Sequence, residues 1–149
     1  MPEIFNLLRC ESLEPCEWNQ SEWENVADPD LKPGLRSVRD PRYLLRPEAI
    51  ESVFLMYRMT GKSEYQEMAW RMFQAIRKAT ETDLAFSAIQ SVKVTDTVKD
   101  DSMESFWLSE TLRYFFLIFS SPDLINLDEF VFNTEAHPLR RPVPFTDES

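Results

Sequence analysis

The sequence predicts an all-α fold made of helical hairpins, with short β segments. Only two of the 149 residues are glycine, and a β fold with tight turns would need more. The hydrophobic content of 43% is enough to bury the core of one domain. Three stretches also place apolar residues at helical spacing between start and stop signals, which favours helices over strands.

Residues 1–42 are interpreted as an irregular lead-in. The first ten, MPEIFNLLRC, are apolar enough to need burial at once, and they lack the basic start and small-residue end of a signal peptide. A chain that begins inside a core suggests a fragment. Residues 10–42 are charged, contain prolines and lack periodicity.

Two short signals in this lead-in bear on the compartment. Cys10 and Cys16 are the only cysteines, and they are compatible with a disulfide in a secreted protein or with two thiols in the cytosol. Asn19 opens the tripeptide Asn-Gln-Ser, which fits the glycosylation sequon but also occurs often by chance. A zinc site has little support, because His137 is the only histidine.

The stretch YLLRPEAIESVFLMYRMTG predicts a first helix that begins at Pro47 and ends at Gly61. Proline suits the first helical position, and glycine suits the position just past the end. Leu55 and Met56 add a second apolar face, so we expect this helix to be buried on more than one side.

A second helix follows directly. Ser63 and Gln66 have the form of a capping box at its start, and the apolar residues that follow form one face. Because the connection is so short, the two helices should form an antiparallel hairpin with an inner and an outer helix.

Residues 86–94 alternate enough to predict a short strand or hairpin. Ser102 is the expected cap of a third helix, from about Met103 to Phe119, which is apolar nearly all round. The first and third helices start about 55 residues apart, a spacing that suits repeated helical hairpins.

These hairpins occupy residues 43–139 in our interpretation, and residues 140–149 are expected to be a disordered tail. The formal net charge of −10 argues against a nucleic-acid partner and favours cations or neutral polar ligands. No run of eighteen apolar residues is present, so we expect no membrane segment in this chain.

Acidic side chains on helices that should be buried are the main candidates for chemistry. Glu48 and Glu51 lie in the first helical turn, where the helix dipole stabilises an anion, although acids are common there for structural reasons alone. Glu110 lies among aromatic residues, where a carboxylate must be paired, for instance with Arg113, or bound to a metal. Calcium prefers oxygen ligands, and Thr134 offers a hydroxyl and a carbonyl.

Four segments, in order, resemble the C-terminal part of class I α-1,2-mannosidases, glycoside hydrolase family 47. They are YLLRPEAIESVFLMYRMTG, YQEMAWRMFQAI, DSMESFWLSETLRYFFLIF and LDEFVFNTEAHPL, and the resemblance extends from about Asp40 to Leu139. It implies that the chain is the C-terminal part of an (α/α)7 barrel of helical hairpins.

The resemblance also implies roles in a reaction. Arg46 and Glu48 are similar to the family's Arg-Pro-Glu motif, in which the glutamate is the general base and the arginine binds substrate. Phe106 resembles the aromatic residue that stacks on the mannose ring, and Glu110 resembles the acid that contacts sugar hydroxyls. His137 is interpreted as structural.

A Ca²⁺ cofactor is implied as well. Thr134 resembles the only direct protein ligand of the calcium ion, through its hydroxyl and carbonyl oxygens. The side chains that resemble carboxylates holding calcium-bound waters are Glu48, Glu51, Glu110 and Glu135.

The implied function is calcium-dependent removal of α-1,2-linked mannose from high-mannose N-glycans, with inversion at the anomeric carbon. The family's general acid lies upstream of the Arg-Pro-Glu motif, in hairpins that these 149 residues lack, so the fragment is expected to be inactive alone. The resemblance places the protein in the secretory pathway, in the endoplasmic reticulum or Golgi lumen or secreted. Two alternatives are a lectin-like module that binds mannose glycans without catalysis, and a helical interaction domain without sugar chemistry.

Overall fold

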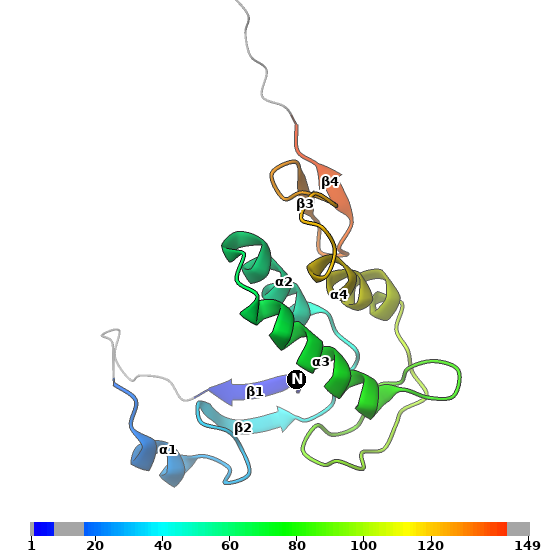
Figure 1. Ribbon diagram of the computed structural model, residues 1–149. Coiled ribbons are helices and arrows are strands. Elements are labelled where there is room, and N and C mark those ends of the chain that lie inside the picture. Colours follow the sequence, from blue (N-terminus) through cyan, green and yellow to red (C-terminus); the bar gives the residue numbers. More distant parts are fainter. Residues whose placement is uncertain (1, 8–16, 143–149) are drawn as a thin grey trace, which may run out of the picture.

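The computed structural model describes residues 2–7 and 17–142 (Figure 1). Its elements follow one another along the chain as β1 (Ile4–Leu7), α1 (Gln20–Val26), β2 (Leu35–Asp40), α2 (Glu48–Thr60), α3 (Glu64–Thr80), the π-helix η1 (Trp107–Thr111), α4 (Leu112–Ile118), β3 (Phe130–Phe132) and β4 (Pro138–Arg140).

Helices α2 and α3 form the antiparallel hairpin that the sequence predicts. Gly61 ends α2 in the left-handed conformation, with φ +68°, and its amide donates to the carbonyl of Tyr57 at 2.8 Å. The predicted capping box is wrong, because the Ser63 side chain makes no capping hydrogen bond. The Gln66 side chain instead donates to the carbonyl of Ile118 at 2.9 Å and so ties α3 to the end of α4.

The third helix starts later than predicted. Helix η1 begins at Trp107 rather than Met103, and it runs directly into α4. The residue expected to cap the helix instead takes part in a non-local backbone pairing, since the Ala88 amide donates to the Ser102 carbonyl at 2.9 Å. The predicted strand over residues 86–94 is also wrong, since only isolated bridges form there, such as that between Tyr43 and Ile89.

The main core lies where α2, α3 and α4 meet. Phe54 on α2 is fully buried, and its ring centroid lies 5.4 Å from that of Tyr114 and 5.9 Å from that of Phe132. The buried residues of this cluster are Ile50, Phe54, Ala69, Tyr114, Phe115, Leu117, Ile118 and Ala136. A second buried cluster comprises Tyr43, Leu45, Ile89 and Trp107.

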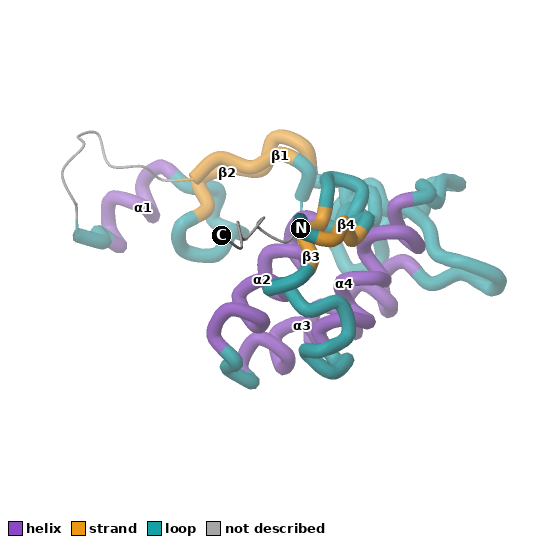
Figure 2. Tube along the Cα trace, turned by 90° about the horizontal axis from the view of Figure 1, so that it is seen from above, coloured by secondary structure: helices purple, strands orange, loops and turns teal. Residues whose placement is uncertain are grey.

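The lead-in is more regular than expected. Strands β1 and β2 pair antiparallel, with Ile4 opposite Asp40, and α1 lies at the outer end of this pair, away from the helical core (Figures 1 and 2). Asn19 caps α1, because its Oδ1 accepts from the amide of Glu22 at 3.1 Å. The sequence interpretation missed these strands because each pairs with a distant segment. Cys10 and Cys16 lie outside the described residues.

Two residues that the sequence interpretation assigns to the tail, Arg140 and Arg141, belong to a hairpin or are tied to it. Strands β3 and β4 pair antiparallel, with Phe130 opposite Arg140, and the Arg141 amide donates to the Glu129 carbonyl at 2.7 Å. Residues up to Arg141 are therefore tied to the β3–β4 hairpin. Residues 143–149 lie outside the described part of the chain.

Helix α2 buries one face only. Ile50 and Phe54 face the core, whereas Leu55 and Met56 are exposed, and Met59 is 77% exposed. The prediction of burial on more than one side is therefore not met within the described residues, because α3 and α4 cover only one side of the helix. Among those residues, no helix is both long and apolar enough to cross a membrane.

Candidate functional site

The Arg-Pro-Glu segment is held by the residue before it. Leu45 is fully buried with φ +62°, a left-handed conformation that is uncommon for a leucine. Its carbonyl accepts a 2.7 Å hydrogen bond from the hydroxyl of Thr111, which lies in η1. This contact fixes the turn into α2 against the helix that carries Glu110, so two of the predicted site segments are joined directly.

Arg46 is the point where several candidate side chains meet. Its Nε donates to an oxygen of Glu3 at 2.6 Å, and its Nη1 lies 3.9 Å from an oxygen of Glu48. The guanidinium carbon also lies 5.6 Å from the ring centroid of Phe106. The predicted base, the predicted arginine and the predicted stacking ring are thus neighbours.

Glu110 is buried, with 7% of its surface exposed, and it belongs to η1. Burial raises the pKa of its carboxyl, and the negative charges of Glu135, Glu48 and Glu51 raise that pKa further, whereas Arg113 acts in the opposite direction. The negative charges of the other three predicted carboxylates therefore all act on Glu110. Glu110 is thus near enough to the other three for their charges to affect it.

The proposed pairing of Glu110 with Arg113 is wrong. Among the described residues Arg113 forms no ion pair with Glu110, and its Nη1 donates instead to the carbonyl of Ala136. Ala136 is fully buried with φ +53°, at the turn between β3 and β4. Arg113 therefore holds the β3–β4 loop against α4.

The β3–β4 loop is organised by an asparagine. The Asn133 side-chain oxygen accepts from the amides of Glu135 at 3.1 Å and His137 at 2.8 Å, as in an Asx turn. This turn leaves Thr134 and Glu135 exposed. Thr134 is thereby presented on a fixed turn, where its oxygens are accessible.

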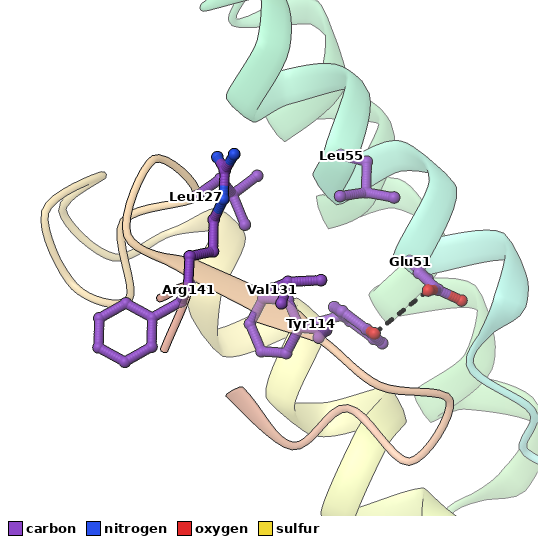
Figure 3. A pocket seen from close by; sticks show the side chains of 8 residues that line it. Glu51, Leu55, Tyr114, Leu127, Val131 and Arg141 are labelled. Carbon is purple, nitrogen blue, oxygen red and sulfur yellow. Dashed lines mark hydrogen bonds between the residues drawn. The ribbon is translucent and has the colours of Figure 1, made fainter. Parts of the chain in front are cut away.

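Glu51 lies in a pocket of about 370 Å³ between α2, α4 and the β3–β4 hairpin (Figure 3). The hydroxyl of Tyr114 donates to its Oε1 at 3.3 Å. Burial raises the pKa of the Tyr114 hydroxyl, and so does the charge of Glu51. The hydroxyl therefore stays protonated and orients the Glu51 carboxylate.

The predicted residues do not share one cavity. Arg46 and Glu48 line a separate pocket of about 680 Å³, together with Glu3 and Tyr43. No group of three His, Cys, Asp or Glu side chains in residues 2–7 and 17–142 is close enough to hold a metal ion between them.

Several residues that shape the site were not predicted. Glu3 and Asn133 form hydrogen bonds with the candidate residues Arg46 and Glu135, and Thr111 holds Leu45, the residue before Arg46. The asparagine has a local signal, since Asn is common where a turn begins. Glu3 and Thr111 have none, because their partners lie more than forty residues away.

Comparison with protein families finds that residues 1–141 match glycosyl hydrolase family 47. The chain is 40% identical over 153 aligned positions to the human endoplasmic reticulum mannosyl-oligosaccharide 1,2-alpha-mannosidase, covering 93% of the chain and 22% of the human protein. It is 46% identical over 97 positions to mannosyl-oligosaccharide 1,2-alpha-mannosidase MNS1 of Arabidopsis thaliana, covering 65% of the chain and 17% of that protein. The chain thus spans only about a fifth of the length of these relatives.

A solved structure agrees with the sequence comparison. The alpha-1,2-mannosidase from Trichoderma reesei superposes with a TM-score of 0.68 at 41% identity, over 72% of this chain and 23% of that enzyme. The fold class predicted from the sequence is thereby confirmed.

Proposed function

The chain belongs to glycosyl hydrolase family 47, and from this membership we propose that it supplies part of the active site of an α-1,2-mannosidase acting on high-mannose N-glycans. The observation that supports the proposal is the cluster of motif residues around Arg46, whose guanidinium lies 3.9 Å from an oxygen of Glu48 and 5.6 Å from the ring centroid of Phe106. The buried Glu110 adds to it, because the charges of the other three motif carboxylates raise its pKa. The names of the relatives support the substrate class, since they are mannosyl-oligosaccharide 1,2-alpha-mannosidases.

Glu48 is the proposed general base. It is the first residue of α2 and its side chain is 66% exposed, so a water molecule can reach its carboxylate. In an inverting reaction the water oxygen bonds to the anomeric carbon as the glycosidic bond breaks, and the proton of that water passes to the Glu48 carboxylate. The leaving oxygen must also receive a proton from a general acid. None of the residues assigned here by resemblance to the family's motifs is that acid.

Arg46, Phe106 and Glu110 are proposed to bind the sugar. A ring such as that of Phe106 offers an apolar face to the C–H groups of a pyranose, and it is half-buried, so one part remains free for contact. Arg46 can donate to sugar oxygens from its exposed Nη atoms, because only its Nε is bound by Glu3.

Oxygen atoms of carboxylates, hydroxyls and carbonyls are the ligands that calcium prefers, and the motif residues supply these types. Neighbouring carboxylates raise the pKa of Glu110, and a divalent cation beside them would offset this repulsion. We propose Thr134 as the direct ligand, and the carboxylates that hold water on the ion as Glu48, Glu51, Glu110 and Glu135. When bound, calcium would orient sugar hydroxyls in the site.

Membership of this family supports a place in the secretory pathway, as the name of the human relative indicates for that protein. In that compartment Cys10 and Cys16 are a candidate disulfide and Asn19 a candidate glycosylation site. The Asn19 side chain is exposed, although its oxygen caps α1.

The test is mannose release by the natural protein that carries these residues. We expect free mannose from a high-mannose N-glycan, loss of that activity with a chelator and its return with calcium. Because the reaction inverts, NMR should show β-mannose as the first product. An α-mannose product, or activity indifferent to chelation, would contradict the proposal. The 149 residues expressed by themselves should release no mannose.

A further inference from the structure

Glu3 is fixed in place by the β1–β2 pair. It immediately precedes β1, and its amide donates to the carbonyl of Arg42 at 3.0 Å, which continues the antiparallel pairing beyond β2. Its side chain is only 13% exposed. A carboxylate that is this well covered loses hydration, so its oxygens need partners in the protein.

Both oxygens of Glu3 have such partners. Oε1 accepts from the amide of Leu44 at 3.2 Å, and Oε2 accepts from Nε of Arg46 at 2.6 Å. The first contact fixes the direction of the carboxylate, and the second is a short charge-assisted bond to the arginine. Glu3 thus joins the start of the sheet to the segment that leads into α2.

Within the described part of the chain, little besides Glu3 holds Arg46. Its other charged neighbour, Glu48, lies 3.9 Å away and is itself 66% exposed, so this ion pair is weak. The contact with Phe106 has no hydrogen bond to set its direction. An arginine has several rotatable bonds, and fixing it before a ligand arrives reduces the entropy lost on binding.

We propose that Glu3 is a positioning residue that holds the Arg46 guanidinium in the orientation used to bind the mannoside. Glu3 touches Arg46 through Nε and leaves the two Nη groups for the sugar. The inference rests on the proposed function for the role of Arg46, but the contact between the two residues can be tested independently of any sugar.

Glu3→Gln is the sharpest variant. An amide keeps the shape of the side chain but replaces one carboxylate oxygen with an NH2 donor, so one of the two donors, from Leu44 and Arg46, loses the oxygen that it now faces. Asp40→Asn is the matched control, because Asp40 accepts from the Nε of Arg42 at 2.9 Å in the same region. Asp40→Asn also replaces a carboxylate that binds an arginine, but that arginine, Arg42, does not belong to the candidate site.

The first measurement follows the Arg46 Nε–H group by NMR in the 149-residue chain without ligand. We expect faster hydrogen exchange and a lower order parameter at this group in Glu3→Gln than in wild type, and no change at Arg46 in Asp40→Asn. An unchanged Arg46 signal in a folded Glu3→Gln protein would overturn the proposal.

The second measurement is the Kd for a sulfur-linked α-1,2-mannobiose, which resists hydrolysis, in the natural protein with calcium. We expect Glu3→Gln and Arg46→Gln each to weaken binding about tenfold, and the double variant to be no weaker than either. Weaker binding in Arg46→Gln alone, with Glu3→Gln like wild type, would overturn the positioning role. If Arg46 loosens in Glu3→Gln but neither variant changes Kd, the positioning contact stands and the proposed function of Arg46 fails.

Discussion

The hydroxyl of Thr111 donates a 2.7 Å hydrogen bond to the carbonyl of Leu45, 66 residues earlier in the chain. Both residues are fully buried. Leu45 has a left-handed backbone and precedes α2, and the bond from Thr111 gives its carbonyl a hydrogen-bond donor. The same bond connects the Arg-Pro-Glu segment to η1. The hydroxyl of Thr111 therefore helps to fix the position of Glu48 relative to Glu110, together with the packing of Leu45 and Trp107 in one buried cluster.

Replacing this threonine tests that contribution. Thr111→Val keeps the shape but leaves the Leu45 carbonyl buried and unpaired, so the free energy of unfolding should fall by about 1–3 kcal/mol. Thr111→Ser retains the hydroxyl and should cost less than the valine. Urea unfolding followed by circular dichroism measures both, and a valine variant as stable as wild type would contradict the structural role.

The turn between α2 and α3 gives a second prediction. Gly61 has φ +68°, and an added Cβ would meet no atom within 4 Å, so Gly61→Ala introduces backbone strain without a clash. The free energy of unfolding should fall by about 1–2 kcal/mol. Ser63→Ala, two residues on, should change it little, because the Ser63 side chain caps nothing. Equal effects of the two variants in thermal unfolding would argue against this account.

Glu48→Gln tests the proposed base. The amide preserves shape but cannot take the proton of the attacking water, so kcat of the natural protein should fall by about 10²–10⁴-fold with a smaller change in KM. Glu67→Gln is the control, since Glu67 is an exposed acid in the first turn of α3. Turnover near the wild-type value in Glu48→Gln would assign the base to another residue.

Thr134→Ala tests the proposed calcium ligand. The variant loses the hydroxyl and keeps the carbonyl, and calcium affinity should fall at least about tenfold. The rise in melting temperature at a fixed calcium concentration should shrink as well, because bound calcium stabilises only the folded state. Thr134→Ser keeps the hydroxyl and should remain close to wild type. If Thr134 is only a turn residue, calorimetric titration will give the same affinity for all three proteins.

The sequence predicted a structural element well when the residues that determine it lie close together in the chain. Helix α2 was predicted well because proline and glycine mark its ends, at Pro47 and Gly61. The late start of η1 was missed, because Ser102 and Ala88, which pair with each other, are too far apart in the sequence for a local pattern to reveal the pairing. Strands β1 and β2 were missed for the same reason.

The candidate site shows the same division. Glu110 stood out in the sequence as an acid among aromatic residues, and it is buried as expected. The alternative in which it pairs with Arg113 does not hold, since Arg113 is bound to the Ala136 carbonyl at a turn that only the folded chain brings close. The roles of Glu48, Thr134 and the other motif residues came from resemblance to a family, and they stay predictions until they are measured.

The π-helix has a geometric consequence for how this region can vary. An α-helix advances by about 100° per residue, and a π-helical turn accommodates one extra residue. Residues 107–111 are therefore rotated relative to the helical face that α4 presents to the core. The direction in which Glu110 points is thus set by the number of residues in this turn as well as by their chemistry. Removal of a single residue here would turn the carboxylate to another side of the helix while α4 kept its packing.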